Sequence, residues 1–151
     1  MTSEQQDLLA RRRAGFDQWL AQRLPILADF ATALELPNPP LIVADPERYL
    51  PPIDAWLRDQ AVGPDEWAWA VLRVGYFGGE VLIQRFAGCW SVCEAPSSRF
   101  FARYVVGSFV RVPNPAAIAD PFEVAAACLS QPPGRSLVSL LEEVGLGLAG
   151  C

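Results

Sequence analysis

Few residues of this chain could perform acid–base or nucleophilic chemistry. Histidine is absent from all 151 positions, and the twelve basic residues are all arginine. The lack of histidine excludes Ser-His-Asp and Cys-His nucleophiles, and it excludes any zinc or iron site with histidine ligands. Acid–base chemistry would therefore fall on carboxylates, tyrosine or cysteine.

The most informative carboxylate is Glu80, in the apolar stretch VGYFGGEVLIQRFAGCWSV, residues 74–92. A carboxylate on a mostly buried helix could have a raised pKa and act as a general base together with Tyr76 or an arginine. The alternative is a structural acid that caps a loop or pairs with an arginine of the neighbouring sheet, such as Arg99, Arg103 or Arg111. We favour the structural interpretation, because no second carboxylate has the spacing typical of a glycosidase pair.

The four cysteines favour neither a disulfide nor a metal site. Cys89 and Cys93 would lie about 13 Å apart on an extended strand, too far for an intrachain disulfide. We expect Cys128 to be a small core residue and Cys151 to be an exposed terminal thiol. Because the chain has no histidine and no C-x-x-C spacing, we expect no metal and no cofactor.

The glycines between residues 75 and 88 raise the question of a phosphate loop. Their spacing matches neither G-x-G-x-x-G nor G-x-x-x-x-G-K-[ST], and there is no lysine to reach a phosphate. A β-hairpin turning at Gly78-Gly79 is a second possibility. Both faces of that hairpin would be apolar and would need covering.

A helix over residues 65–87 is the interpretation that we favour. It would gather four side chains into one narrow polar stripe, as in the central helix of a domain: Glu66, Arg73, Glu80 and Gln84. Gly75 and Gly79 would lie on the far side and let another element approach closely. Gly88 would take the left-handed conformation that commonly ends a helix.

The rest of the chain predicts an α+β fold, with a single domain over 1–151 that has three parts. Residues 1–62 are expected to be helical, with one helix from Thr2 or Ser3, a second from Pro25, and a short one at IDAWLRDQ. Residues 64–112 carry the core helix and a small antiparallel sheet, with strands in CWSVCEA and RFFARYVVGSFVRV joined at APSS. Residues 115–148 hold two short helices, PFEVAAACLSQ and SLVSLLEEVGL.

Composition and charge favour a protein partner. The formal charge of −5 opposes binding to nucleic acid or to an anionic membrane, and it suits a basic partner. The N-terminus lacks the apolar core of a signal peptide and no run reaches transmembrane length, so a cytoplasmic location is expected. Trp67 and Trp69 cannot share a helix face, so at least one should be partly exposed, as is common at interfaces.

The segment GYFGGEVLIQRFAGCWSV resembles the G-x-[YF]-x-G-E-[VL]…G-x-W pattern of small uncharacterised bacterial α+β proteins, similar to immunity-type proteins of polymorphic toxin systems. The matching residues are Gly75, Tyr76, Gly79, Glu80, Val81, Gly88 and Trp90, with Pro121-Phe122-Glu123-Val124 downstream. The resemblance spans about residues 64–130. It implies an α+β fold and no known enzymatic activity, and it supplies no catalytic residues.

The leading hypothesis is a non-enzymatic binding module for a protein partner, in its most concrete form an immunity-type protein that neutralises a toxin. The candidate binding residues are Tyr76, Glu80, Trp90, Arg99 and Arg103. One alternative is a small enzyme without histidine that uses Glu80 as acid or base. Another is an adaptor subunit of a larger assembly. The oligomeric state stays open.

Overall fold

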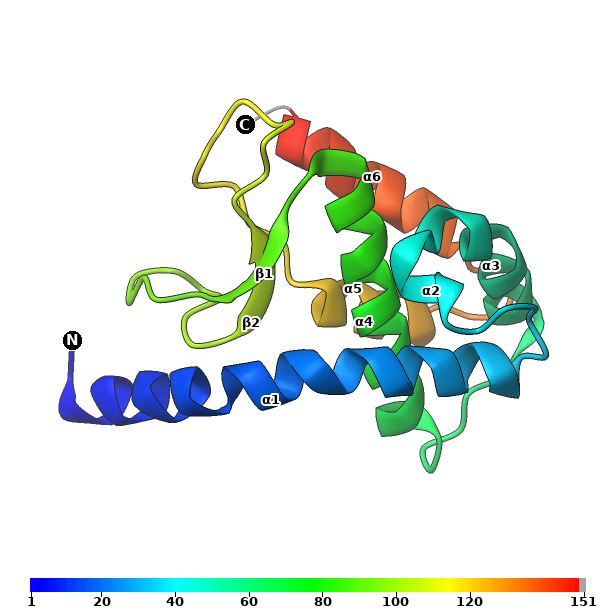
Figure 1. The fold of residues 1–151 in the computed structure, drawn as a ribbon, viewed down its shortest axis with the longest axis horizontal. Coiled ribbons are helices and arrows are strands. Elements are labelled where there is room, and N and C mark those ends of the chain that lie inside the picture. The colour runs from blue at the N-terminus through cyan, green and yellow to red at the C-terminus, as the bar shows by residue number, and fades with distance from the viewer. Residues whose placement is uncertain (150–151) are drawn as a thin grey trace.

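The computed structural model describes residues 1–149, and its elements are labelled in Figure 1. They follow in the order α1 (Ser3–Ala33), α2 (Leu41–Ala44), the short 3-10 helix η1 (Pro46–Tyr49), α3 (Leu50–Asp59), α4 (Trp67–Phe86), β1 (Cys89–Val92), β2 (Tyr104–Gly107), α5 (Pro121–Ser130) and α6 (Leu137–Ala149). Within this part of the chain, six α-helices and one two-stranded antiparallel sheet form an α+β fold, as predicted. None of these helices is long and apolar enough to cross a membrane.

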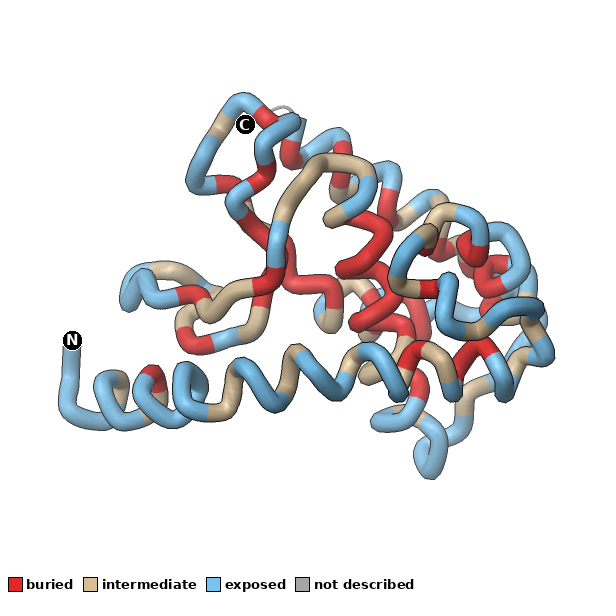
Figure 2. Tube along the Cα trace, in the orientation of Figure 1, coloured by how far each residue is buried: buried red, intermediate tan, exposed pale blue. Residues whose placement is uncertain are grey.

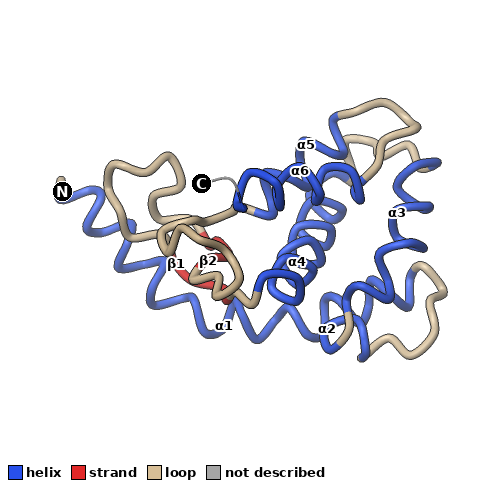
Figure 3. Tube along the Cα trace, turned by 90° about the horizontal axis from the view of Figure 1, so that it is seen from above, coloured by secondary structure: helices blue, strands red, loops and turns tan. Residues whose placement is uncertain are grey.

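Helix α4 lies at the centre, with α1 on one side and α5 and α6 on the other (Figures 1 and 3). The helix predicted over residues 65–87 is therefore present as Trp67–Phe86, with residues 65 and 66 in the preceding turn, and the hairpin alternative is wrong. Every residue from Val74 to Leu82 is buried, and this segment forms the red centre of Figure 2. The left-handed residue after the helix is Ala87, with a φ of 54°, and not Gly88 as predicted.

The two predicted glycine contacts are present on α4. A Cβ added to Gly75 would lie 2.2 Å from the ring of Phe122, and one added to Gly79 would lie 2.1 Å from the ring of Trp90. The absent side chains thus let α5 and β1 pack directly on the backbone of α4.

Helix α1 differs from the prediction of two helices, because it continues through Pro25. Proline inside a helix removes one backbone hydrogen bond and clashes with the preceding turn. Side chains also bind the backbone of α1 before the proline: the Tyr76 hydroxyl donates to the Trp19 carbonyl at 2.8 Å, and Arg23 of the same helix donates to the Leu20 carbonyl at 2.9 Å. Beyond the proline, Leu27 and Phe30 are fully buried, which anchors the second half of the helix to the core.

The sheet is shorter than predicted. Strands β1 and β2 pair in antiparallel register from Cys89 opposite Gly107 to Val92 opposite Tyr104. Ala102 and Ser108 flank β2 with φ angles of 61° and 52°, so the backbone leaves the extended conformation at both ends. Residues 93–103 therefore connect the strands, in place of the short APSS turn.

Buried carboxylates fix the two C-terminal helices, which form as predicted. Asp120 caps α5 by accepting hydrogen bonds from the backbone of Phe122 and Glu123. Asp54 on α3 accepts a backbone hydrogen bond from Val138 at 3.2 Å, which ties α3 to the first turn of α6. Cys128 on α5 is fully buried, and this confirms its prediction as a core residue.

Candidate functional site

Glu80 is buried at the contact between α4, α1 and β1. Its Oε1 atom accepts a hydrogen bond from Arg23 Nε at 2.7 Å and a second from the Trp90 indole nitrogen at 3.2 Å. The side chain is 6% exposed, whereas that of Arg23 is 24% exposed. A single carboxylate oxygen therefore joins three elements of the fold.

The partner of Glu80 was predicted wrongly. The arginine comes from α1 and not from the neighbouring sheet. Arg99 and Arg103 donate to acids at the start of α5, and Arg111 donates to the Arg85 carbonyl. Arg23 lies 57 residues before Glu80, so no local pattern could have connected the two. The structural interpretation of Glu80 fits this geometry, because Oε1 already has two donors from the chain itself.

Tyr76 cannot reach a partner from its position. It is fully buried, its hydroxyl donates to the Trp19 carbonyl, and its ring packs against Trp19 and Trp90 with centroid distances of 4.9 and 6.1 Å. Burial raises the pKa of Tyr76 to about 12, although nearby Arg23 acts in the opposite direction. Tyr76, Glu80 and Trp90 thus form one interior cluster with Trp19 and Arg23.

Arg99 and Arg103 lie outside that cluster. Both donate to Glu123, and Arg103 also donates to Asp120 at 3.1 Å. The guanidinium of Arg99 lies 4.1 Å above the ring of Phe100. These two predicted binding residues therefore hold the β1–β2 connection against the start of α5. The structure brings them together with each other and not with Glu80.

The cysteines and acidic residues form no metal centre within residues 1–149. No three cysteine, aspartate or glutamate side chains gather there closely enough to hold a metal ion. Cys89, Cys93 and Cys128 are free thiols, and only Cys89 is exposed. The prediction for Cys151 lies outside the described residues.

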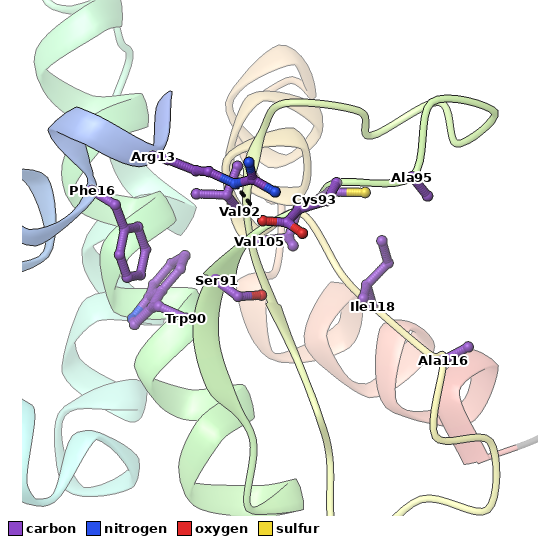
Figure 4. Close-up of a pocket in the computed structure, with 11 residues that line it drawn as sticks. Arg13, Phe16, Trp90, Ser91, Val92, Cys93, Ala95, Val105, Ala116 and Ile118 are labelled. Atoms are coloured by element: carbon purple, nitrogen blue, oxygen red, sulfur yellow. Dashed lines mark hydrogen bonds and ion pairs between the residues drawn. The ribbon is translucent and has the colours of Figure 1, made fainter. Parts of the chain in front are cut away.

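A groove of about 630 Å³ lies beside the hairpin (Figure 4). We call it the β1 groove. Arg13 and Phe16 of α1 form one wall, β1 and the residues after it form the floor, and Ala116 and Ile118 form the other wall. The only charged side chains in it are Arg13 and Glu94, whose Nε and Oε1 atoms lie 2.6 Å apart. The remaining lining is largely apolar.

The floor of the β1 groove carries an unpaired strand edge. Val106 exchanges both backbone hydrogen bonds with Ala119, on the side away from β1, and it lies opposite Trp90. Because hydrogen-bonded and non-hydrogen-bonded pairs alternate in an antiparallel ladder, Trp90 and Val92 direct their N–H and C=O groups away from β2. Among residues 1–149, no group pairs with these four backbone atoms.

Sequence reasoning missed Arg13, Phe16 and Glu94 as residues of this groove. Arg13 stands in a run of three adjacent arginines, residues 11–13, and all three are exposed, as is common for such a run on a solvated helix face. The ion pair between Arg13 and Glu94 spans 81 residues and depends on where α1 crosses the hairpin. The only feature of the sequence that pointed to this groove is the short strand CWSV. In a two-stranded sheet, each strand has one edge that is not paired within the sheet.

Comparison with known proteins identifies no relatives: no family model, no curated protein and no solved structure matches this chain. The geometry is therefore the only basis for a proposed function.

Proposed function

We propose that this chain is a non-enzymatic cytoplasmic binding module for a protein partner, in its most specific form an immunity-type protein that neutralises a basic toxin. The observation that carries the proposal is the unpaired edge of β1 at the floor of an apolar groove. Such an edge is a template for an extended segment of another protein, which adds a strand through main-chain hydrogen bonds. The charge of −5 supports a basic partner through electrostatic attraction.

The geometry gives less support to the alternative function, in which Glu80 is the acid or base of an enzyme. An acid–base role for Glu80 would require a carboxylate free to face a substrate. Glu80 instead borders a hollow of only about 220 Å³, and its Oε1 atom is held by Arg23 and Trp90. By contrast, the backbone groups of Trp90 and Val92 have no partner within residues 1–149.

The test uses a pair of substitutions at Val92. Val92→Pro removes the outward N–H, which the fold does not use, and an edge strand tolerates proline. Val92→Thr keeps the N–H and a β-branched side chain, so it is the matched control. A partner would be isolated from native lysate on the unmodified chain, identified, and then titrated against both variants. We expect Val92→Thr to retain binding and Val92→Pro to lose at least about tenfold in affinity, or about 1.4 kcal/mol.

Amide hydrogen exchange gives an independent measurement if Val92→Pro fails to fold. The N–H groups of Trp90 and Val92 should exchange rapidly in the free chain and become protected in the complex, because a bound strand would pair with them. Toxicity of the isolated partner, relieved by co-expression of this chain, would support the immunity form. A partner that binds without protecting either amide would contradict the use of the β1 edge.

A further inference from the structure

A second hollow lies at the start of α4, toward the other end of α1. It has a volume of about 450 Å³ and is lined by Trp56 of α3, by Asp65 and Glu66 of the preceding turn, and by Trp69 of α4. We call it the Trp56–Trp69 pocket. Its aromatic neighbour Phe30 is 14 residues from Phe16 of the β1 groove, or about 21 Å along a helix axis. The pocket is therefore separate from the β1 groove, and its role does not depend on the proposed function.

The two tryptophan rings meet at a steep angle and remain partly open. Their centroids are 6.4 Å apart and their planes make an angle of 66°. Both rings pack nearly perpendicular to Phe30, which is fully buried, with centroid distances of 5.8 and 5.7 Å. Phe30 thus holds the rings from below, while Trp69 stays 37% exposed. Aromatic faces attract cations within about 6 Å of the ring centroid.

The two carboxylates of the pocket have no cation of their own. Asp65 and Glu66 are exposed, and within residues 1–149 neither side chain forms an ion pair or a hydrogen bond. Every well-buried carboxylate of the same part of the chain does have donors: Asp54, Glu80 and Asp120. The pocket therefore combines π faces and unpaired negative charge, and both attract a cation.

The chain itself shows which cation suits these rings. The guanidinium of Arg73 lies 4.5 Å above the ring of Trp69. Arg73 lies one turn after Trp69 in α4, whereas Asp65 and Glu66 come before it, and Arg73 does not line the pocket. Burial lowers the pKa of Arg73, and the charge of Asp29 acts in the opposite direction. A guanidinium also carries N–H donors in a planar fork that matches carboxylates, which a quaternary ammonium lacks.

We propose that the Trp56–Trp69 pocket binds a guanidinium group. The group would lie against the parts of the two indole rings that line the pocket and donate N–H hydrogen bonds to Asp65 and Glu66. Two sources share this chemistry: an arginine side chain exposed on another protein, and a free small guanidine.

The test is a titration followed by the indole N–H resonances of Trp56 and Trp69. The probes are N-acetyl-arginine amide and N-acetyl-citrulline amide, which has nearly the same shape without the charge. We expect saturable shifts with the arginine probe, at least about tenfold weaker binding of the citrulline probe, and weakening at high salt. Equal binding of the two probes, or no saturable shift, would overturn the proposal.

Matched variants separate the site from general electrostatics. Asp65→Asn with Glu66→Gln should weaken the arginine probe at least about tenfold. Glu142→Gln with Glu143→Gln removes the same charge from exposed positions of α6 and should leave the affinity unchanged. Equal loss in both double variants would contradict a local site. Neither double variant touches a buried side chain, so both should fold.

The source of the guanidinium follows from a second pair of probes. A Gly-Gly-Arg-Gly-Gly peptide that binds as well as the blocked arginine would indicate a protein side chain. Agmatine binding more than about tenfold tighter than the peptide would indicate a free small guanidine. Either ranking supports the guanidinium site, and failure of all guanidinium probes overturns it whatever the fate of the β1 groove.

Discussion

Glu80 and Glu66 belong to the same stretch of chain, at the interior and at the N-terminal end of α4, yet their surroundings are opposite. Glu80 is buried and joined to Arg23 and Trp90. Glu66 is exposed, and its side chain has no partner within the described residues. A buried charge must be paired because its desolvation is costly, whereas an exposed one is stable in water without a partner.

The difference teaches where function should be sought in this fold. Glu80 and Tyr76, the residues that the sequence marked as candidates for acid–base chemistry, form hydrogen bonds that hold the core together. Within residues 1–149, the outward backbone groups of β1 and the acids of the Trp56–Trp69 pocket have no partner, and both sets border surface hollows. Predictions can therefore compare interior positions with surface positions.

The largest effect is expected from Glu80→Ala. It leaves the part-buried Arg23 and the Trp90 indole N–H without their acceptor, and we expect a loss of about 3 kcal/mol of unfolding free energy. Glu66→Ala is the control and should change stability by less than about 0.5 kcal/mol. Denaturant titration of the two variants measures both. Similar values for the two would remove the distinction between interior and surface acids.

The raised pKa of Tyr76 predicts that the chain loses stability at alkaline pH. Its pKa is about 12 in the folded chain and about 10 when unfolded. Below pH 10 the phenol is neutral in both states and its contribution is complete. Between pH 10 and 12 the unfolded state loses the proton first, so stability should fall by about 2–3 kcal/mol across that window. Tyr76→Phe should remove this part of the slope, and an unchanged slope would place the ionisation elsewhere.

Neighbouring glycines of α4 give opposite predictions. Gly79→Ala puts a methyl group 2.1 Å from the Trp90 ring, so the ring must shift, and we expect a loss of about 1–3 kcal/mol. Gly78→Ala meets nothing closer than Leu141 at 3.7 Å and should gain up to about 1 kcal/mol from helix propensity. Thermal unfolding compares them directly. Stabilisation by both would show that β1 does not need the close approach at Gly79.

Local patterns predicted much of this fold. The 100° periodicity gave α4 as a helix, and its glycines predicted a close contact that Phe122 and Trp90 supply. Helices α5 and α6 form in the two segments predicted to be short helices, PFEVAAACLSQ and SLVSLLEEVGL. These features depend on residues a few positions apart, whose relation the helix geometry alone determines.

Long-range features could not be predicted. Residue Pro25 was interpreted as a helix start, but the burial of Leu27 and Phe30 in the core stabilises the continuation of α1 beyond it. The Glu80–Arg23 pair and the Arg13–Glu94 pair join positions 57 and 81 residues apart. Such pairs depend on how helices cross, which no spacing in the sequence encodes. For the same reason, neither hollow was predicted from its lining residues.

The smallest effect on stability is expected from Arg13→Ala. Both side chains of the Arg13–Glu94 pair are 55% exposed, and exposed pairs contribute little because water and salt screen them. The melting temperature should therefore remain within about 1 °C of the parent. The same change removes one charged wall of the β1 groove, so affinity for the partner should change if that wall contacts it. A variant that alters binding and not folding is what a surface site predicts, whereas a drop in melting temperature would make the pair part of the core architecture, as Glu80 is.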